Sequence, residues 1–291
     1  MDLLAPQARL IAGLFSRPVF RALAADHVPS SVRVKLAVAR GALGVRGGTV
    51  GDFFDEAFDA LLRDYRSEYV YKNVITKKLI FGIHSPKSAA LLTEFWVNLS
   101  KADSVVLNGT STVYEIKTEY DNLARLPQQL ADYSKVFDRI NVVTHEGAVP
   151  AVLALVPEHV GVIVLSRRNA LHKEKQATSN IAQLDHWTIF NCLRKQEFVN
   201  ILERQCGGAP DATPDVFRTR AFELFRQLPK DVMSAEFVRE VRKRTTNSEV
   251  VDFTSQLPAS LKTLGVSEQL SRLRRSKLLE TLDSKLKNYV V

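Results

Sequence analysis

The order of apolar and polar residues predicts helices over the first third of the chain. From residue 3 to about residue 40 the apolar side chains recur at helical spacing, and Pro18 and Pro29 divide this stretch into short helices. Residues 49–66 carry an apolar stripe opposite acidic side chains, which is typical of an amphipathic helix. Residues 67–82 continue the helical pattern up to a glycine.

The middle of the chain alternates between strand-like and helical patterns. Short apolar runs predict strands at 94–99, 103–107, 112–117, 141–144 and 160–166. Helical spacing predicts helices at 87–92, 121–137 and 149–156. Strands that are followed by alternating helices and strands predict an α/β fold, with a mixed sheet flanked by helices.

Beyond residue 181 the pattern is helical again. Helical spacing predicts helices at 185–205, 214–228, 234–245, 248–264 and 267–288. We therefore predict three consecutive regions: a helical N-terminal region at 1–48, an α/β core at 49–181 and a helical C-terminal region at 182–291.

The charge of the chain favours an anionic partner, and its apolar runs are too short for a membrane span. The chain of 291 residues has a net charge of +8, which favours nucleic acid as a partner. No run approaches the roughly 18 to 20 apolar residues of a membrane span, and Gln7, Arg9 and Arg17 interrupt the apolar residues of the N-terminus. We expect a cytoplasmic protein with no membrane partner, in which Cys192 and Cys206 are free thiols.

A glycine-rich stretch at 41–51 has the composition of a phosphate-binding loop but not its context. No predicted strand precedes it, and no Gly-Lys-Ser/Thr sequence ends it. We interpret it as a flexible boundary instead.

The residues with the clearest chemical potential lie in a predicted hairpin. Two apolar runs joined by Asn108-Gly109 predict two antiparallel strands. Side chains alternate along a strand, so Glu115 and Lys117 share one face, and Asp103 on the neighbouring strand can reach them. Mg²⁺ prefers oxygen ligands of this kind, and a lysine beside it can position a water for phosphodiester hydrolysis.

This arrangement resembles the PD-(D/E)XK nuclease superfamily, whose members share a restriction-endonuclease-like fold. The resemblance rests on Asp103, on the Glu-X-Lys pair Glu115 and Lys117, and on the upstream helical acid Glu68. It implies a nuclease that depends on Mg²⁺ or Mn²⁺. Asp103 and Glu115 would bind the metal with the Ile116 carbonyl, Lys117 would orient or deprotonate the attacking water, and Glu68 would complete the outer or second metal site.

The following helix adds a second element of resemblance. Gln129 and Tyr133 are similar to the QxxxY element of RecB-type and lambda-exonuclease-type nucleases, where both side chains contact the substrate backbone. Tyr133 also falls on the apolar stripe of its helix, so simple packing is the alternative. Arg125 and Lys72 lie one turn from Gln129 and Glu68, and each would contact a phosphate or form an exposed salt bridge.

The resemblance extends to residues 65–145, which are similar to a family of bacterial nuclease-like proteins. The sequence departs from the superfamily motif at Ala102, where the superfamily name has proline. This position makes no chemical contribution to the site. Glu94 would be a further metal ligand if its strand adjoins that of Asp103. The alternative is an ordinary charge at a strand end.

These observations predict a metal-dependent nuclease that acts on DNA rather than RNA, in phage defence or in repair. The alternative is an inactive nuclease-fold module that binds nucleic acid or a protein partner. Basic clusters in the predicted C-terminal helices suit either a nucleic-acid surface or an exposed helix face. A homodimer or a protein partner through the helical regions also stays open.

Overall fold

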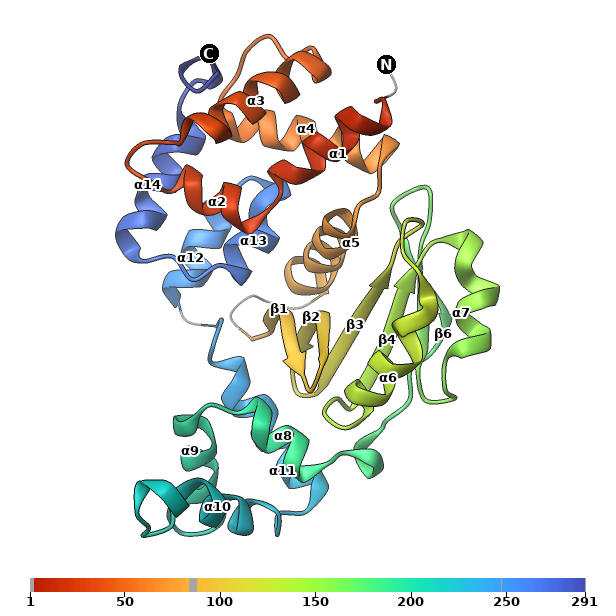
Figure 1. Ribbon diagram of the computed structural model, residues 1–291, viewed down its shortest axis with the longest axis vertical. Helices are drawn as coiled ribbons and strands as arrows, with labels where there is room; N and C mark the ends of the chain where they lie inside the picture. Colours follow the sequence, from red (N-terminus) through yellow and green to blue (C-terminus); the bar gives the residue numbers. More distant parts are fainter. Residues whose placement is uncertain (1–2, 84–87, 247, 291) are drawn as a thin grey trace. The chain divides into compact units, whose positions relative to one another are not determined.

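The chain forms two compact units (Figure 1). The first unit joins the two ends of the chain, Met1–Ile83 and Ser248–Val291, and the second is His84–Asn247. The computed structural model describes residues 3–83, 88–246 and 248–290.

This division differs from the three consecutive regions predicted at 1–48, 49–181 and 182–291. The helices after residue 247 pack with the N-terminal helices, and the helices of 182–246 belong with the sheet. Hydrophobic periodicity shows which face of a helix is buried but not which distant helix covers it, so the sequence pattern could not reveal this grouping.

Helices make up the described elements of the first unit. Its eight α-helices are α1 (Ala5–Leu14), α2 (Arg17–Leu23), α3 (Ser30–Leu43), α4 (Val50–Asp64), α5 (Glu68–Ile75), α12 (Ser248–Gln256), α13 (Lys262–Ser267) and α14 (Arg272–Asp283). Thr49 and Asp52 cap α4 reciprocally, with N···O distances of 2.9 and 3.0 Å. The predicted apolar stripe of this helix is confirmed, because Phe53 and Phe54 are fully buried in the core of the unit.

The second unit is built on a six-stranded mixed sheet, which confirms the predicted α/β class. Its strands are β1 (Ala90–Val97), β2 (Ser100–Leu107), β3 (Ser111–Lys117), β4 (Arg139–Thr144), β5 (Gly161–Leu165) and β6 (Leu171–Lys175), and they lie in sequence order. The pairs β1–β2, β2–β3 and β5–β6 are antiparallel. The pairs β3–β4 and β4–β5 are parallel.

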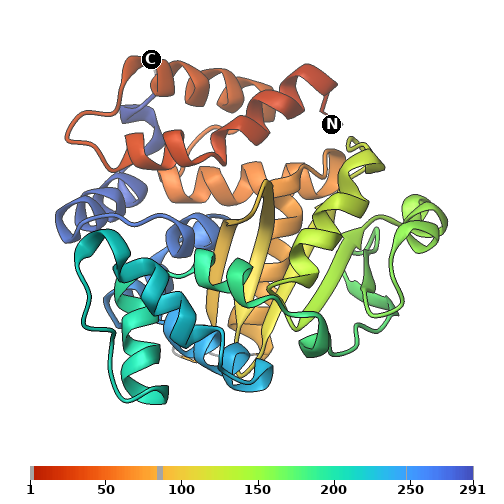
Figure 2. The same cartoon turned by 60° about the horizontal axis from the view of Figure 1, so that its bottom comes forward.

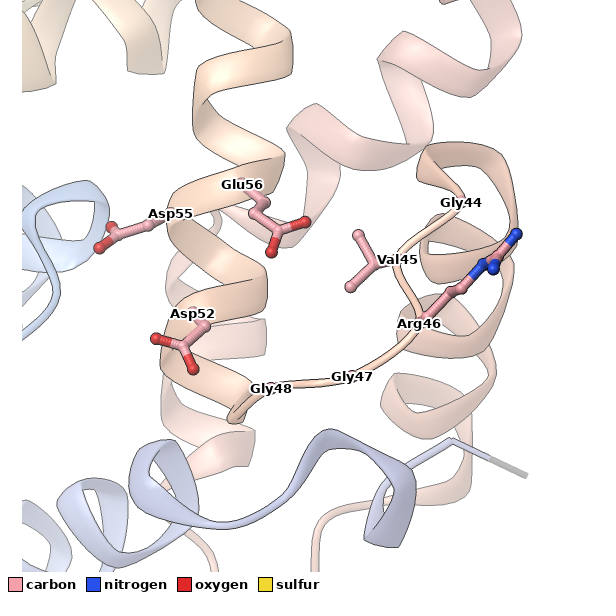
Figure 3. Close-up of a pocket in the computed structure, with 8 residues that line it drawn as sticks. All are labelled: Gly44, Val45, Arg46, Gly47, Gly48, Asp52, Asp55 and Glu56. Atoms are coloured by element: carbon pink, nitrogen blue, oxygen red, sulfur yellow. The ribbon is translucent and has the colours of Figure 1, made fainter.

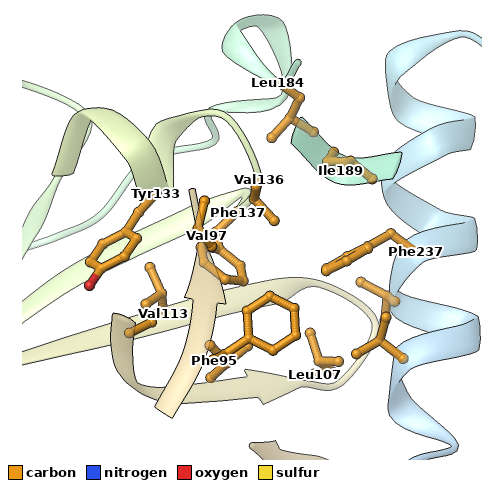
Figure 4. Packing of buried hydrophobic residues seen from close by; sticks show 14 of the residues in the cluster. Phe95, Val97, Leu107, Val113, Tyr133, Val136, Phe137, Leu184, Ile189 and Phe237 are labelled. Atoms are coloured by element: carbon orange, nitrogen blue, oxygen red, sulfur yellow. The ribbon is translucent and has the colours of Figure 1, made fainter. Parts of the chain in front are cut away.

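Helices connect the parallel strands and extend the core of this unit. The connecting helices are α6 (Leu126–Ser134) and α7 (Val149–Leu155). Figure 2 shows α6, in yellow-green, running across one face of the sheet. The chain then adds α8 (His186–Cys192), α9 (Lys195–Gln205), α10 (Pro214–Phe225) and α11 (Lys230–Arg242). Figure 4 shows how Phe237 of α11 and Phe137 meet Phe95 of the sheet in a common core.

Four local predictions were wrong. Residues 87–92 were predicted as a helix, but the chain pairs as strand β1 from Ala90, opposite Leu107. Strand β6 was missed because its side chains are largely exposed, which removes the alternation of a half-buried strand. The helix predicted at 185–205 is broken, since Leu193 and Arg194 are extended between α8 and α9. The helix predicted at 248–264 is interrupted, because α12 ends at Gln256 and α13 begins at Lys262 after a 3₁₀-helix at Ala259–Leu261.

Across the described parts of the chain, each helix is too short or too polar to traverse a lipid bilayer.

Candidate active site

The hairpin of β2 and β3 brings Asp103 to Glu115. Its register sets Ser104 opposite Tyr114, so the next residues along the two strands, Asp103 and Glu115, are neighbours. The Asp103 carboxylate accepts a hydrogen bond from the backbone N–H of Ile116 at 2.8 Å. This contact fixes the Asp103 carboxylate against the strand that carries the Glu-X-Lys sequence.

Helix α6 completes the site from above the sheet. Glu115 and Lys117 are buried, and the Lys117 ammonium lies 2.8 Å from the Glu115 carboxylate. Lys117 also donates to the side-chain oxygen of Gln129 at 2.8 Å. The Tyr133 hydroxyl donates to the second oxygen of Glu115, again at 2.8 Å. We call Asp103, Glu115, Lys117, Gln129 and Tyr133 the carboxylate–lysine site.

Tyr133 packs in the core and also makes a polar contact within the site, whereas its predicted contact with a substrate backbone stays a prediction. The ring is fully buried, as the packing alternative expects, and Figure 4 shows it beside Val113. Its hydroxyl nevertheless reaches the polar site and contacts Glu115. Tyr133 therefore links the apolar core to the carboxylate–lysine site.

Burial dominates the ionisation of Glu115. Removal from water raises the pKa of this carboxyl above its usual value, although Lys117 and the hydrogen bonds from Tyr133 and Gln129 oppose the shift. Burial, followed by the nearby Glu115 charge, also raises the pKa of Tyr133, so its hydroxyl remains a donor. A carboxylate whose burial is incompletely compensated gains from an additional positive charge.

The donor chemistry of the site suits a hard divalent cation. Asp103 and Glu115 supply carboxylate oxygens from adjacent strands, and the carbonyl of Ile116 lies between Glu115 and Lys117 in the chain. Within the described residues no cluster of three His, Cys, Asp or Glu side chains could hold a metal ion. Two carboxylates are nevertheless enough for Mg²⁺, which keeps several waters and takes further oxygens from phosphates.

The segment that contains this site also decides the family. Residues 62–250 match the family model described as bacteriophage P4 protein cII, which is well over half of the chain. The chain belongs to the bacteriophage P4 protein cII family. The matched segment includes the carboxylate–lysine site and the whole sheet. Neither a curated protein nor a solved structure matches the chain.

Two predicted site residues of this P4 cII family chain lie in the first unit. Glu68 and Lys72 form an ion pair with each other along α5. Lys72 is nearly buried, whereas the Glu68 side chain is about half exposed. The roles predicted for them toward a metal and a phosphate stay predictions.

Arg125 lies in the second unit, one helical turn before Gln129. It ends a short 3₁₀-helix, Leu123–Arg125, that leads into α6, and its side chain is exposed. A phosphate contact from this position stays a prediction.

The strand of Glu94, β1, is the neighbour of the strand of Asp103, as a role for Glu94 as a metal ligand would require. It adjoins β2, and because Thr93 pairs with Ser104 and Phe95 with Ala102, Glu94 falls opposite Asp103. Its backbone is left-handed, with a φ of 57°, which is uncommon for a residue other than glycine. The Glu94 carboxylate lies 3.2 Å from the Lys101 ammonium. The sequence alone could not decide whether these two strands were neighbours.

Thr144 supports the site and was not singled out from the sequence. Its hydroxyl donates to the backbone carbonyl of Lys117 at 2.8 Å, and its side chain is fully buried. The parallel register places it directly beside Lys117. A threonine at the end of a predicted strand gives no signal of this contact until the pairing of β3 with β4 is known.

The glycine-rich stretch of this P4 cII family chain connects α3 to α4 and lines a pocket of about 540 Å³ in the first unit (Figure 3). Asp52, Asp55 and Glu56 of α4 also line the pocket. The lining has three carboxylates against one cation, Arg46, and this excess of negative charge disfavours a phosphate ligand, which agrees with the interpretation that this is not a nucleotide site. The stretch lies inside the first unit rather than at its border.

Proposed function

We propose that this chain is a nuclease of the PD-(D/E)XK type that hydrolyses phosphodiester bonds in DNA with Mg²⁺ or Mn²⁺. One observation carries the proposal: the Lys117 ammonium is held between Glu115 and Gln129 at the carboxyl end of β3, with Asp103 on the neighbouring strand. Metal-assisted hydrolysis of a phosphodiester requires carboxylates that bind the metal and a group that orients the water, and an acid pair beside an oriented amine supplies both.

Each side chain has a distinct task in this proposal. Asp103 and Glu115, with the Ile116 carbonyl, would hold the metal, which would neutralise charge on the scissile phosphate and lower the pKa of a water. Lys117 would orient or deprotonate the attacking water. Gln129 fixes the direction of the Lys117 side chain through its side-chain oxygen. Tyr133 holds Glu115 in place through its hydroxyl.

Further parts of the proposal rest on the resemblance. Glu68 would complete a second metal site, and Lys72 and Arg125 would contact substrate phosphates. The biological role would be defence against foreign DNA, including phage DNA, or repair.

A second candidate function is an inactive nuclease-fold module that binds nucleic acid or a protein partner. It is favoured by the internal pairing of Glu115, since both carboxylate oxygens already accept hydrogen bonds from Lys117 and Tyr133. Calorimetry separates the two candidates. Binding of Mn²⁺ that Asp103→Ala removes supports the nuclease, and its absence supports the module.

The decisive experiment is a cleavage assay with linear DNA, circular DNA and RNA, with and without Mn²⁺. We expect DNA cleavage that requires the metal and disappears in Glu115→Ala and in Lys117→Ala. Both variants should keep the circular-dichroism spectrum of the unmodified chain. Full activity of a purified Lys117→Ala protein would refute the proposal.

A further inference from the structure

The sheet brings a second set of basic residues to the edge that holds Lys117. Strands β3, β4 and β5 are parallel, so their carboxyl ends lie at one edge. The register forms a row across the sheet, in which Lys117 pairs with Thr144, Thr144 with Val164, and Val164 with His172 of β6. The turn between β5 and β6 therefore lies at the same edge as the carboxylate–lysine site, as the view in Figure 1 also shows.

Hydrogen bonds give this turn a defined shape. The N–H of Ser166 donates to the carbonyl of Ala170 at 2.9 Å, and the N–H of Asn169 donates to the carbonyl of Ser166 at 2.9 Å. Asn169 has a left-handed backbone with a φ of 59°. Arg167 and Arg168 occupy the tip of this turn, and both are exposed.

Strand β6, an edge strand of the sheet, carries further charged side chains beyond this turn. His172, Lys173 and Glu174 are exposed in it. Lys175 is turned away, because its ammonium donates to the carbonyl of Pro157. We call the exposed cations Arg167, Arg168 and Lys173 the basic hairpin tip. Within the β5–β6 hairpin these three cations outnumber the one exposed acid, Glu174, so this hairpin suits a polyanion.

We propose that the basic hairpin tip binds the phosphate backbone of the DNA substrate to one side of the cleavage position; this inference rests on the proposed nuclease function. Neighbouring strands lie about 4.8 Å apart, so β5 and β6 are roughly 10 and 14 Å from β3. Phosphates of one B-DNA strand advance about 3.4 Å along the axis, so this span corresponds to about three or four nucleotides. Arginine matches phosphate with a planar pair of donors, which contributes affinity without reading the sequence.

The test measures DNA binding separately from cleavage. A fluorescent 20-base-pair duplex is titrated with protein carrying Lys117→Ala, between 50 and 200 mM salt, with and without the added pair Arg167→Ala and Arg168→Ala. Each lost phosphate contact lowers the slope of log affinity against log salt by about 0.9, so we expect a decrease of nearly 2. The affinity at the low-salt end should fall by at least about 10-fold.

The matched control removes two exposed arginines, Arg220 of α10 and Arg226 at its C-cap, with Arg220→Ala and Arg226→Ala in the same Lys117→Ala background. This control has the same net charge, and its salt slope should stay near that of the Lys117→Ala protein. Equal slopes in the two double-arginine variants would overturn the proposal, and so would an absence of salt-dependent DNA binding. Arginine-dependent binding, together with no cleavage in Mn²⁺ by the unmodified chain that retains Lys117, would instead refute the nuclease function and leave the basic hairpin tip as a DNA contact.

Discussion

Two of the buried networks of acids and cations in the second unit differ in their electrostatics. In the carboxylate–lysine site, Glu115 faces one cation, Lys117. In the second network, which we call the helical network, Glu236 and Glu240 of α11 share Arg204 of α9, and Lys243 also pairs with Glu240 at 2.7 Å. Both networks combine nearly buried carboxylates with close cations.

The pKa values of the glutamates in the two networks are shifted in opposite directions. Burial raises the pKa of Glu115, and the contacts of the site do not offset it. Burial also opposes ionisation of Glu236 and Glu240, but hydrogen bonds, chiefly from Arg204 and Gln205 to Glu236 and from Lys243 and Asn200 to Glu240, together lower both pKa values. A compensated network holds helices together, whereas an uncompensated carboxylate retains the capacity to take up a proton or a metal ion.

The largest expected effect distinguishes the two lysines. Lys117→Met should reduce DNA cleavage by about 10² to 10⁴-fold, the range for loss of a positioned acid–base group. Lys243→Met removes a lysine–glutamate contact of similar length and should leave the cleavage rate unchanged. Rates with Mn²⁺ in excess check both variants, and equal losses in the two would contradict the distinction.

Loss of a cation should destabilise the fold more in the helical network than in the carboxylate–lysine site. Arg204→Met leaves two buried carboxylates without their shared cation and should lower the free energy of unfolding by about 3 kcal/mol. Lys117→Met should cost less, because Glu115 already has a raised pKa and becomes neutral when its partner is removed. Urea unfolding at pH 7 gives both values, and a greater loss for Lys117→Met would show that the site is the more compensated network.

The pH dependence of stability should have opposite signs in the two networks. A raised folded-state pKa stabilises the fold below the ordinary value of 4.5, and this contribution is lost as the pH rises through the folded-state pKa of Glu115. A lowered pKa stabilises the fold above 4.5, and this contribution is lost as the pH falls through the folded-state pKa of Glu240.

Thermal unfolding in EDTA from pH 3 to 8 tests this sign. Relative to the unmodified chain, Glu115→Gln should gain stability as the pH rises above 4.5. Glu240→Gln should lose relative stability as the pH rises from below its folded-state pKa toward 4.5. Parallel curves for the two variants would refute the assignment.

The smallest effect is expected for the Tyr133 hydroxyl. Tyr133→Phe keeps the buried ring and removes one hydrogen bond to Glu115, which should cost about 1 kcal/mol in the free energy of unfolding. It should also raise the pKa of Glu115 further, since this hydrogen bond lowers it. The pH profile of cleavage measures that shift, and an unchanged profile would assign Tyr133 to packing alone.

Local patterns were sufficient for the centre of this fold. The Asn108-Gly109 turn, the alternation of β3 and the helical spacing of α6 are properties of neighbouring residues, and all three were predicted. The division into two units was not predicted, because it depends on contacts between segments far apart in the chain. The edge strand β6 was also missed, because its largely exposed side chains lack the alternation of a half-buried strand.

The same distinction applies to the candidate site. Asp103, Glu115 and Lys117 could be grouped from strand alternation, and the structure brings them together with Gln129 and Tyr133. The contributions of Thr144 and of the opposite position at Glu94 required the strand order. The basic hairpin tip likewise became visible only when β5 and β6 were placed beside β4.

The β2–β3 hairpin also has a consequence for the order of folding. Its strands and α6 contribute all five side chains of the carboxylate–lysine site from one continuous segment, Asp103 to Tyr133, whereas β4 and β5 must close longer connections before they pair. Short loops close at lower entropic cost, so the polar site should assemble before the parallel half of the sheet. Pulse-labelled hydrogen exchange during refolding would then protect the Tyr114 amide, which faces β2, earlier than the Ile163 amide, which faces β4.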